Sequence, residues 1–107
     1  MPSKFFDKII KRTSKESKIY VSKSLDIIDQ IYEITERKGM TQKDLANALW
    51  KNESEISKWL SGEHNLTLRT IAKIEAVLGE DIIITPMKAK KQYKKKIEVK
   101  KKQEITV

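Results

Sequence analysis

The chain has no cysteine, one histidine and three glycines among its 107 residues, and each scarcity argues against a class of function. Without cysteine there is neither a disulfide framework nor a thiolate metal site, which fits a reducing cytosol. The single histidine, His64, offers too few ligands for a metal centre, so we expect no metal and no other cofactor. The chain also has no phosphate-binding glycine loop and no nucleophile motif, so we do not expect an enzyme.

Long apolar runs are also missing. No stretch approaches the roughly 20 apolar residues that a membrane-spanning helix requires. The first apolar segment, residues 5–10, contains Lys8 and is followed by Lys11 and Arg12, so it does not resemble a signal peptide. We therefore expect a cytoplasmic protein without a membrane partner.

The net charge of +8 is concentrated at the two ends of the chain. Residues 1–24 hold seven basic and two acidic residues, residues 25–87 hold seven and eleven, and residues 88–107 hold nine and two. Basic arms around a mildly acidic centre suit a polyanionic partner. From the charge alone, a solvated and disordered lysine tail that only aids solubility is an equally good interpretation.

The first third of the chain predicts two helices. Phe5, Phe6, Ile9 and Ile10 form an apolar stripe at helical spacing, which predicts a short amphipathic helix over about residues 3–12. Residues 13–18 are polar, so we expect a connection there. A second helix is expected to begin at a Ser22 or Ser24 cap and to end at Lys38 before Gly39. The residues expected on its apolar face are Leu25, Ile27, Ile28, Ile31, Tyr32 and Ile34.

Two short helices joined by a tight turn are predicted between Thr41 and Gly62. Thr41 and Asp44 form a capping-box pattern, and Asn52 and Glu55 form another. The residues expected in the core are Leu45, Ala48, Leu49, Ile56, Trp59 and Leu60. Two helices so joined are the unit that lays one helix in the major groove of DNA.

A further helix is expected to start at a Thr67 cap and to end at Gly79. Its expected buried residues are Leu68, Ile71, Ala72, Ile74, Val77 and Leu78. The β-branched run 82–85 is either a strand or an apolar plug on the core. Lysine dominates beyond it, and residues 93–107 permit strands or disorder equally. The expected fold class is an all-α helical bundle with an N-terminal helical extension, a basic tail and room for a short C-terminal strand.

Four stretches carry a family pattern: Gly39–Ala46, Ile56–Gly62, Leu68–Ile71 and Leu78–Gly79. As a set they resemble the Cro/repressor-type helix-turn-helix family, also called the XRE family, over roughly residues 25–85. The resemblance implies a compact bundle like that of the lambda repressor, which binds double-stranded DNA. The domains expected are an N-terminal helix with its connection over 1–21, a helix-turn-helix domain over 22–86 and a lysine-rich tail over 87–107.

The stretch from Ile56 to Asn65 is similar to a subgroup that includes antitoxins of the host-inhibition-of-growth type. Those proteins bind DNA, pair with small ribonuclease toxins and repress their own operon. The chain departs from the family pattern at the turn, where Trp50 and Lys51 stand in place of glycine and an apolar residue. Without glycine the turn has to accommodate a side chain, and the left-handed backbone conformation is one solution.

The exposed side of the predicted helix 53–61 holds the candidate base-reading residues, because its apolar side is committed to the core. Lys58 can donate to guanine or to a phosphate, and the resemblance places Lys58 and Ser54 toward the bases. Asn52 can pair with adenine if its amide is not used as the helix cap.

Glu53 or Glu55 can accept from cytosine, although Glu55 suits the capping box better. The resemblance makes Gln42 a phosphate anchor or a base contact, and its position in the first turn of a helix is well placed for that. The candidates for contacts to the DNA backbone are Lys43, Asn65, Thr67 and Arg69.

We expect a sequence-specific DNA-binding transcriptional regulator, which is an autorepressor or the antitoxin of a toxin–antitoxin pair. It would act as a homodimer, because one short helix reads too few base pairs, with residues 82–84 or the N-terminal helix as the dimer surface. The alternative is a protein-interaction adaptor that binds a toxin or another partner and has only nonspecific DNA affinity. An RNA-binding role is disfavoured, because only Tyr93 offers a stacking surface among the lysines.

Overall fold

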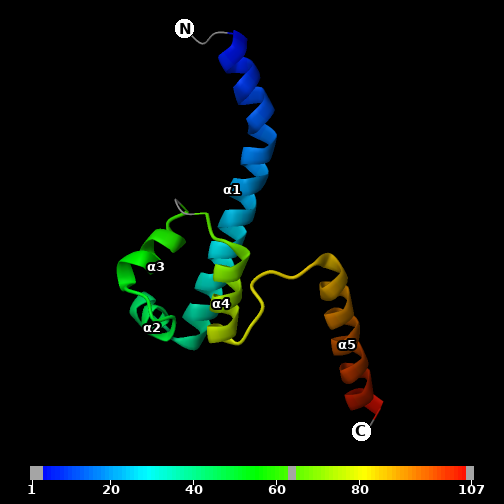
Figure 1. Ribbon diagram of the computed structural model, residues 1–107. Coiled ribbons are helices and arrows are strands. Elements are labelled where there is room, and N and C mark those ends of the chain that lie inside the picture. Colours follow the sequence, from blue (N-terminus) through cyan, green and yellow to red (C-terminus); the bar gives the residue numbers. More distant parts are fainter. Residues whose placement is uncertain (1–3, 63–64, 106–107) are drawn as a thin grey trace.

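The computed structural model describes residues 4–62 and 65–105, which form five helices and no strand (Figure 1). In chain order the helices are α1 (Lys4–Lys38), α2 (Gln42–Ala48), α3 (Glu53–Leu60), α4 (Leu68–Leu78) and α5 (Pro86–Ile105). The prediction of an all-α bundle with a helical N-terminal extension is therefore confirmed for the described residues. Within the same residues, no helix has both the length and the apolar character to cross a bilayer.

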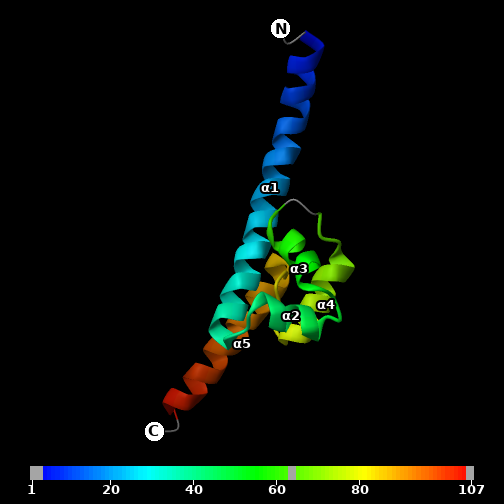
Figure 2. The ribbon, with the colours of Figure 1, turned by 90° about the vertical axis from the view of Figure 1, so that its left-hand side faces the viewer.

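Helix α1 is a single unbroken helix of 35 residues. The predicted connection at residues 13–18 is therefore wrong, and so is the predicted helix start at Ser22 or Ser24. Residues 13–18 are polar but contain neither glycine nor proline, and lysine and glutamate are good helix formers, so nothing in this segment ends the helix. The C-terminal half of α1 packs against the bundle, whereas its N-terminal half projects beyond it (Figure 2).

Helix α1 ends before Gly39, as the sequence predicts. Gly39 has a φ of +68°, and the Met40 N–H donates to the Thr35 carbonyl at 2.8 Å. The Gly39 N–H donates to the Glu36 carbonyl at 3.1 Å. These two bonds are the Schellman motif, which satisfies carbonyl groups left over at a helix end.

The turn between α2 and α3 has the same pair of hydrogen bonds, but with Trp50 where glycine normally stands. The Lys51 N–H donates to the Ala46 carbonyl at 3.0 Å, and the Trp50 N–H donates to the Asn47 carbonyl at 3.3 Å. Trp50 has a φ of +58° and its side chain is 95% exposed. The left-handed conformation considered for this turn is therefore confirmed, and the indole does not pack against α2.

The core lies where the C-terminal half of α1 meets α2, α3 and α4. Its buried apolar residues are Ile28, Ile31, Ile34, Leu45, Ala46, Ile56, Leu60, Ile71, Ile74 and Leu78. Leu49 and Trp59 are partly buried against this cluster, as predicted. Ala46 is 2% exposed, and its small side chain allows α2 and α3 to pack closely.

Six residues expected on the buried faces of the helices are exposed instead: Leu25, Tyr32, Ala48, Leu68, Ala72 and Val77. On α4 the buried face is narrower than predicted, since it consists of Ile71, Ile74 and Leu78. Leu25 lies one turn before Ile28, at the point where α1 leaves the bundle.

The β-branched run after α4 forms no strand, because a side chain takes its backbone donors. The Glu75 carboxylate accepts from the Ile82 N–H at 2.8 Å and from the Ile83 N–H at 3.0 Å. Ile82 packs against the core, so the apolar plug, which was the alternative to a strand, describes this residue. The segment lies beside α1, with a cavity of about 350 Å³ between Ile27 and Ile82–Ile84.

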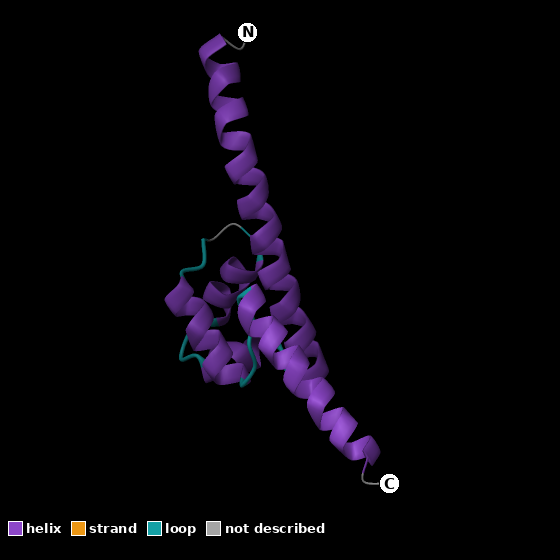
Figure 3. Cartoon of the chain, turned by 90° about the vertical axis from the view of Figure 1, so that its right-hand side faces the viewer, coloured by secondary structure: helices purple, strands orange, loops and turns teal. Residues whose placement is uncertain are grey.

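The lysine-rich end of the chain is the helix α5, so both the strand and the disorder expected over residues 93–107 are wrong as far as Ile105. The Thr85 hydroxyl accepts from the Lys88 N–H at 3.2 Å, and Pro86 is the first helical residue. A threonine cap followed by proline is a helix-start signal, and lysine favours helix thereafter. Seen from the side, α5 carries the C-terminus to the end of the molecule opposite the N-terminus (Figure 3).

Candidate nucleic-acid interface

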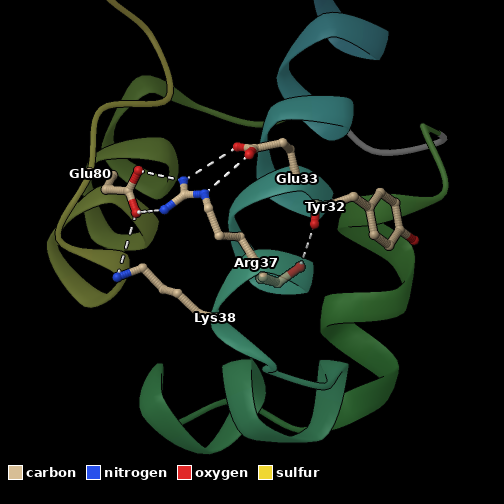
Figure 4. Close-up of polar contacts among 6 residues, drawn as sticks. Tyr32, Glu33, Arg37, Lys38 and Glu80 are labelled. Atoms are coloured by element: carbon tan, nitrogen blue, oxygen red, sulfur yellow. Dashed lines mark hydrogen bonds and ion pairs between the residues drawn. The ribbon is translucent and has the colours of Figure 1, made fainter.

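An ion-pair cluster fixes the end of α1 to the segment that follows α4 (Figure 4). The Arg37 guanidinium contacts the Glu80 carboxylate at 2.6 Å and the Glu33 carboxylate at 3.1 Å, and the Lys38 ammonium lies 3.5 Å from Glu80. The hydrogen bonds that the Arg37 guanidinium donates to Glu80 and Glu33 raise the pKa of Arg37, and the bonds that Glu80 accepts from Arg37 lower the pKa of Glu80. The cluster links Glu80, which follows α4, to the last turn of α1, the helix that leads into α2.

The start of α2 is capped in both directions. The Thr41 hydroxyl accepts from the Asp44 N–H at 3.1 Å, and the Asp44 carboxylate accepts from the Thr41 N–H at 2.9 Å, so the predicted capping box is confirmed. The two bonds with Thr41 lower the pKa of Asp44. Gln42, the first residue of α2, is half-buried, and its amide donates to the Tyr32 hydroxyl at 3.4 Å. Tyr32 thus orients Gln42 and was not predicted as part of the site.

Helix α3 turns a polar side to solvent. Ile56 and Leu60 are buried, whereas Ser54 and Lys58, four residues apart, are both exposed on the opposite side. In the described part of the chain, the Lys58 ammonium makes no ion pair or hydrogen bond. The other exposed side chains of this helix are Glu53 and Ser57. Ser57 was missed from the sequence, although its spacing of three residues from Ser54 places it on the same side.

The Asn52 amide is used as the cap of α3. Its oxygen accepts from the Glu55 N–H at 2.9 Å and from the Ser54 hydroxyl at 2.7 Å. Two-point pairing with adenine needs that oxygen, so the structure leaves Asn52 only its N–H donors for a ligand. The Glu55 carboxylate lies 3.8 Å from the Lys51 ammonium and does not complete the capping box that the sequence predicted.

The start of α4 supplies the remaining candidates. The Thr67 hydroxyl accepts from the Thr70 N–H at 3.2 Å, which confirms its role as a cap. Arg69 in the first turn is exposed, as is Lys43 in the first turn of α2. Asn65 is also exposed, and it lies at the rim of a cavity of about 160 Å³ against Tyr20 of α1. His64 lies outside the described residues.

Taken together, the structure exposes Glu53, Ser54, Ser57 and Lys58 on the solvent side of α3. It places Gln42 and Arg69 in the first turns of the two helices that flank α3 in the chain. A short helix with a solvent-facing polar side, set after a tight turn on a preceding helix, is the arrangement of a helix-turn-helix unit.

Comparison with known proteins agrees with this geometry. A family model described as a helix-turn-helix matches residues 31–83, from the buried half of α1 to the segment after α4. These residues form a helix-turn-helix domain, the class of fold from which DNA-binding regulators are built. The chain is therefore similar to helix-turn-helix proteins over about half of its length, from residue 31 to residue 83. No curated protein and no solved structure matches the chain significantly.

Proposed function

We propose that the protein is a sequence-specific transcriptional regulator that reads the major groove of DNA with α3, acts as a homodimer and does no chemistry on its target. The observation that supports this most directly is the exposed side of α3. Lys58 is free to donate there, and Ser54 lies one turn before it, while the buried side is anchored by Ile56 and Leu60.

The chemistry of this side suits base edges. An unpaired ammonium donates to the two acceptors of guanine, and a serine hydroxyl bonds to several bases. The Ser54 hydroxyl donates to Asn52 but keeps lone pairs that can accept. Gln42, held by Tyr32, would contact the phosphate or base next to the α3 site.

Most of the nonspecific affinity would come from outside the bundle. Residues 25–87 carry eleven acidic and seven basic residues, so the domain by itself repels a polyanion. The lysines of α5 supply the opposite charge on an ordered helix. This division assigns specificity to α3 and nonspecific, salt-sensitive binding to the ends of the chain.

The proposed role is autoregulation, either as a simple autorepressor or as the antitoxin of a toxin–antitoxin pair. Both act by occupying the promoter of their own gene, so both call for a DNA-reading dimer. An antitoxin also binds a toxin, whereas a simple autorepressor does not. Co-expression with the neighbouring genes and purification of the resulting complex would reveal such a partner.

The test is fluorescence anisotropy of the full chain with duplex DNA from immediately upstream of its gene. A scrambled duplex of equal length is run in parallel, across a salt series. We expect tighter binding to the upstream duplex that persists near physiological salt. In the double variant Ser54→Ala/Lys58→Ala we expect this preference to fall by a factor of about 10 or more, because each good base contact contributes about 1–3 kcal/mol of discrimination.

The matched control is Lys90→Ala, which removes one positive charge from α5 and should leave the preference unchanged. If the double variant folds and still prefers the upstream duplex, α3 is not the reading helix. Equal binding of the wild type to both duplexes at every salt concentration would remove the proposed function and favour the adaptor.

A further inference from the structure

The middle of α1 presents an apolar patch that the bundle does not cover. Val21 and Leu25 are 53% and 52% exposed, although each has the side chain of a core residue. Ser17, Lys18 and Ser22 complete a shallow, mostly apolar groove around them. The pair lies near the midpoint of α1, whose 35 residues run from Lys4 to Lys38.

Charged residues flank this patch with opposite signs on its two sides. Lys15 and Lys18 precede it, and Asp26 and Asp29 follow it. All four side chains are exposed, and within the described residues none of them forms an ion pair. Lys15 and Asp29 each lie seven residues from Ser22, and Lys18 and Asp26 each lie four residues from it. These four charges are therefore antisymmetric about Ser22, within one residue of the midpoint between Val21 and Leu25. The other charged residues of this stretch, Glu16 and Lys23, lie on the side of the helix opposite Leu25.

We propose that a second copy of this chain docks here, with the two α1 helices antiparallel about a two-fold axis near Ser22. This pairing places Lys15 and Lys18 of each copy opposite Asp29 and Asp26 of the other, and Val21 packs against Leu25. A parallel pairing would instead place lysine against lysine and aspartate against aspartate. The inference rests on the proposed function, for which it supplies the dimer surface.

The placement of the bundles agrees with a DNA-reading dimer. Leu25 and the fully buried Ile31 are six residues apart, which is about 120° around a helix. An antiparallel two-fold pair therefore carries both bundles on the same side of the paired helices. Ile31 lies nine residues from the proposed axis, so at 1.5 Å per residue the two bundles are about 27 Å apart along the helices. This is near the roughly 34 Å between successive half-sites on one face of DNA.

The other surface considered for a dimer is less suitable. Pairing of residues 82–84 as strands needs free backbone donors. The Ile82 and Ile83 N–H groups are already bound to the Glu75 carboxylate at 2.8 and 3.0 Å. Strand pairing would replace these two hydrogen bonds by two others and so gain little stability. Docking at α1 instead buries apolar surface that is now exposed.

The test is sedimentation equilibrium of the full chain without DNA. We expect the wild type to dimerise. The acidic-face variant Lys15→Asp/Lys18→Asp and the basic-face variant Asp26→Lys/Asp29→Lys should each dissociate with a dimer Kd raised by about 100-fold or more, because like charges then face each other. Mixing the two variants should restore a dimer. One variant has four acidic residues at positions 15, 18, 26 and 29 and the other has four basic residues there, so opposite charges face each other again.

The matched control is Lys90→Asp/Lys94→Asp, which makes the same charge change on α5 and should leave the dimer intact. Circular dichroism checks that each variant keeps its helices, and Leu25→Glu tests the apolar centre separately. A monomeric wild type, or a dimer that persists in all α1 variants, would overturn the inference. A monomer that still prefers its upstream DNA would overturn the dimer surface and leave the reading role of α3 standing.

Discussion

At the scale of single residues, Trp50 is the clearest case of local strain. Its φ of +58° is a conformation that costs a residue with a Cβ roughly 1–2 kcal/mol, and its side chain is 95% exposed, so packing does not offset that cost. We expect Trp50→Gly to raise the free energy of unfolding by about 0.5–1 kcal/mol, after allowing for the greater freedom of glycine in the unfolded chain. Urea unfolding followed by circular dichroism measures the change.

Trp50→Ala is the control for this prediction, because alanine keeps the Cβ and removes only the indole. It should leave the stability nearly unchanged. A gain with alanine equal to that with glycine would show that the backbone conformation is not the cause. Loss of DNA affinity in both variants would show that the indole touches the DNA backbone.

A second prediction at this scale concerns pH. The pKa of Glu80 is lowered from its ordinary 4.5 by Arg37, and that of Asp44 is lowered from 3.8 by Thr41. A lowered folded-state pKa contributes stability that is fully present above the ordinary value and is lost as the pH falls through the lowered value. The melting temperature should therefore decline below about pH 4.5.

Glu80→Gln separates the two groups in a series of thermal melts. The variant should melt at a lower temperature than the wild type at pH 7, and the difference should shrink toward pH 3 as Glu80 of the wild type becomes protonated. A constant difference across the series would mean that the Arg37 cluster contributes through packing and not through charge.

Residue-scale features that depend on near neighbours were predictable from the sequence. The caps Thr41, Asn52 and Thr67 and the glycine at residue 39 each act within one helical turn, so their local pattern is sufficient. Burial was predicted less well, because Leu25, Ala48 and Leu68 match the helical period but are exposed. The spacing of apolar residues in the sequence shows which side of a helix is apolar. It does not show which part of the helix the bundle covers.

At the scale of elements, two polar segments that were predicted to be non-helical form helix. Residues 13–18 and α5 are both highly polar, yet both are helical. Helix formation depends on backbone propensity as well as on an apolar face, and neither segment contains an internal glycine or proline. The start of α5 could nevertheless have been predicted, since Thr85 followed by Pro86 is a capping signal.

The independence of α5 leads to the third prediction. Among its described side chains none is buried, and Asp81 holds its first turns only through Lys88 at 3.4 Å and Gln92 at 3.3 Å. Exposed pairs contribute little, and an isolated helix of this length is marginal in water. On heating, α5 should lose its helix before the bundle unfolds, and Thr85→Ala should weaken it further. Residue-resolved amide shifts would follow the two transitions.

The contrasting variant is Thr67→Ala, which removes the cap of α4 inside the bundle. It should lower the stability of the bundle by about 1 kcal/mol, whereas Thr85→Ala should leave the bundle unchanged. If both variants shift the same single transition, α5 is packed against the bundle more firmly than its exposed side chains indicate.

At the scale of the whole molecule, the positive charge lies at the two ends of the chain, apart from the helix to which we assign specificity. The bundle that carries the proposed reading side of α3 is acidic overall, and nine lysines lie in residues 88–107. The concentration of lysine at the C-terminal end was predictable from the sequence, but the helical structure of α5 was not. That structure changes how α5 is expected to bind DNA. A helix presents its lysines at fixed spacing, so several can neutralise phosphates at once without the entropy cost of ordering a coil.

The final prediction follows from this arrangement. Each phosphate neutralised contributes about −0.9 to the slope of log K against log salt concentration on duplex DNA. Replacing Lys90, Lys94 and Lys101 by glutamine keeps the helix-forming character of α5 and removes three charges, so the slope should flatten by up to about 2.7. The preference for the upstream duplex over the scrambled one should persist, because it belongs to α3. An unchanged slope would show that α5 stays away from the DNA, and a lost preference would show that α5 takes part in sequence readout.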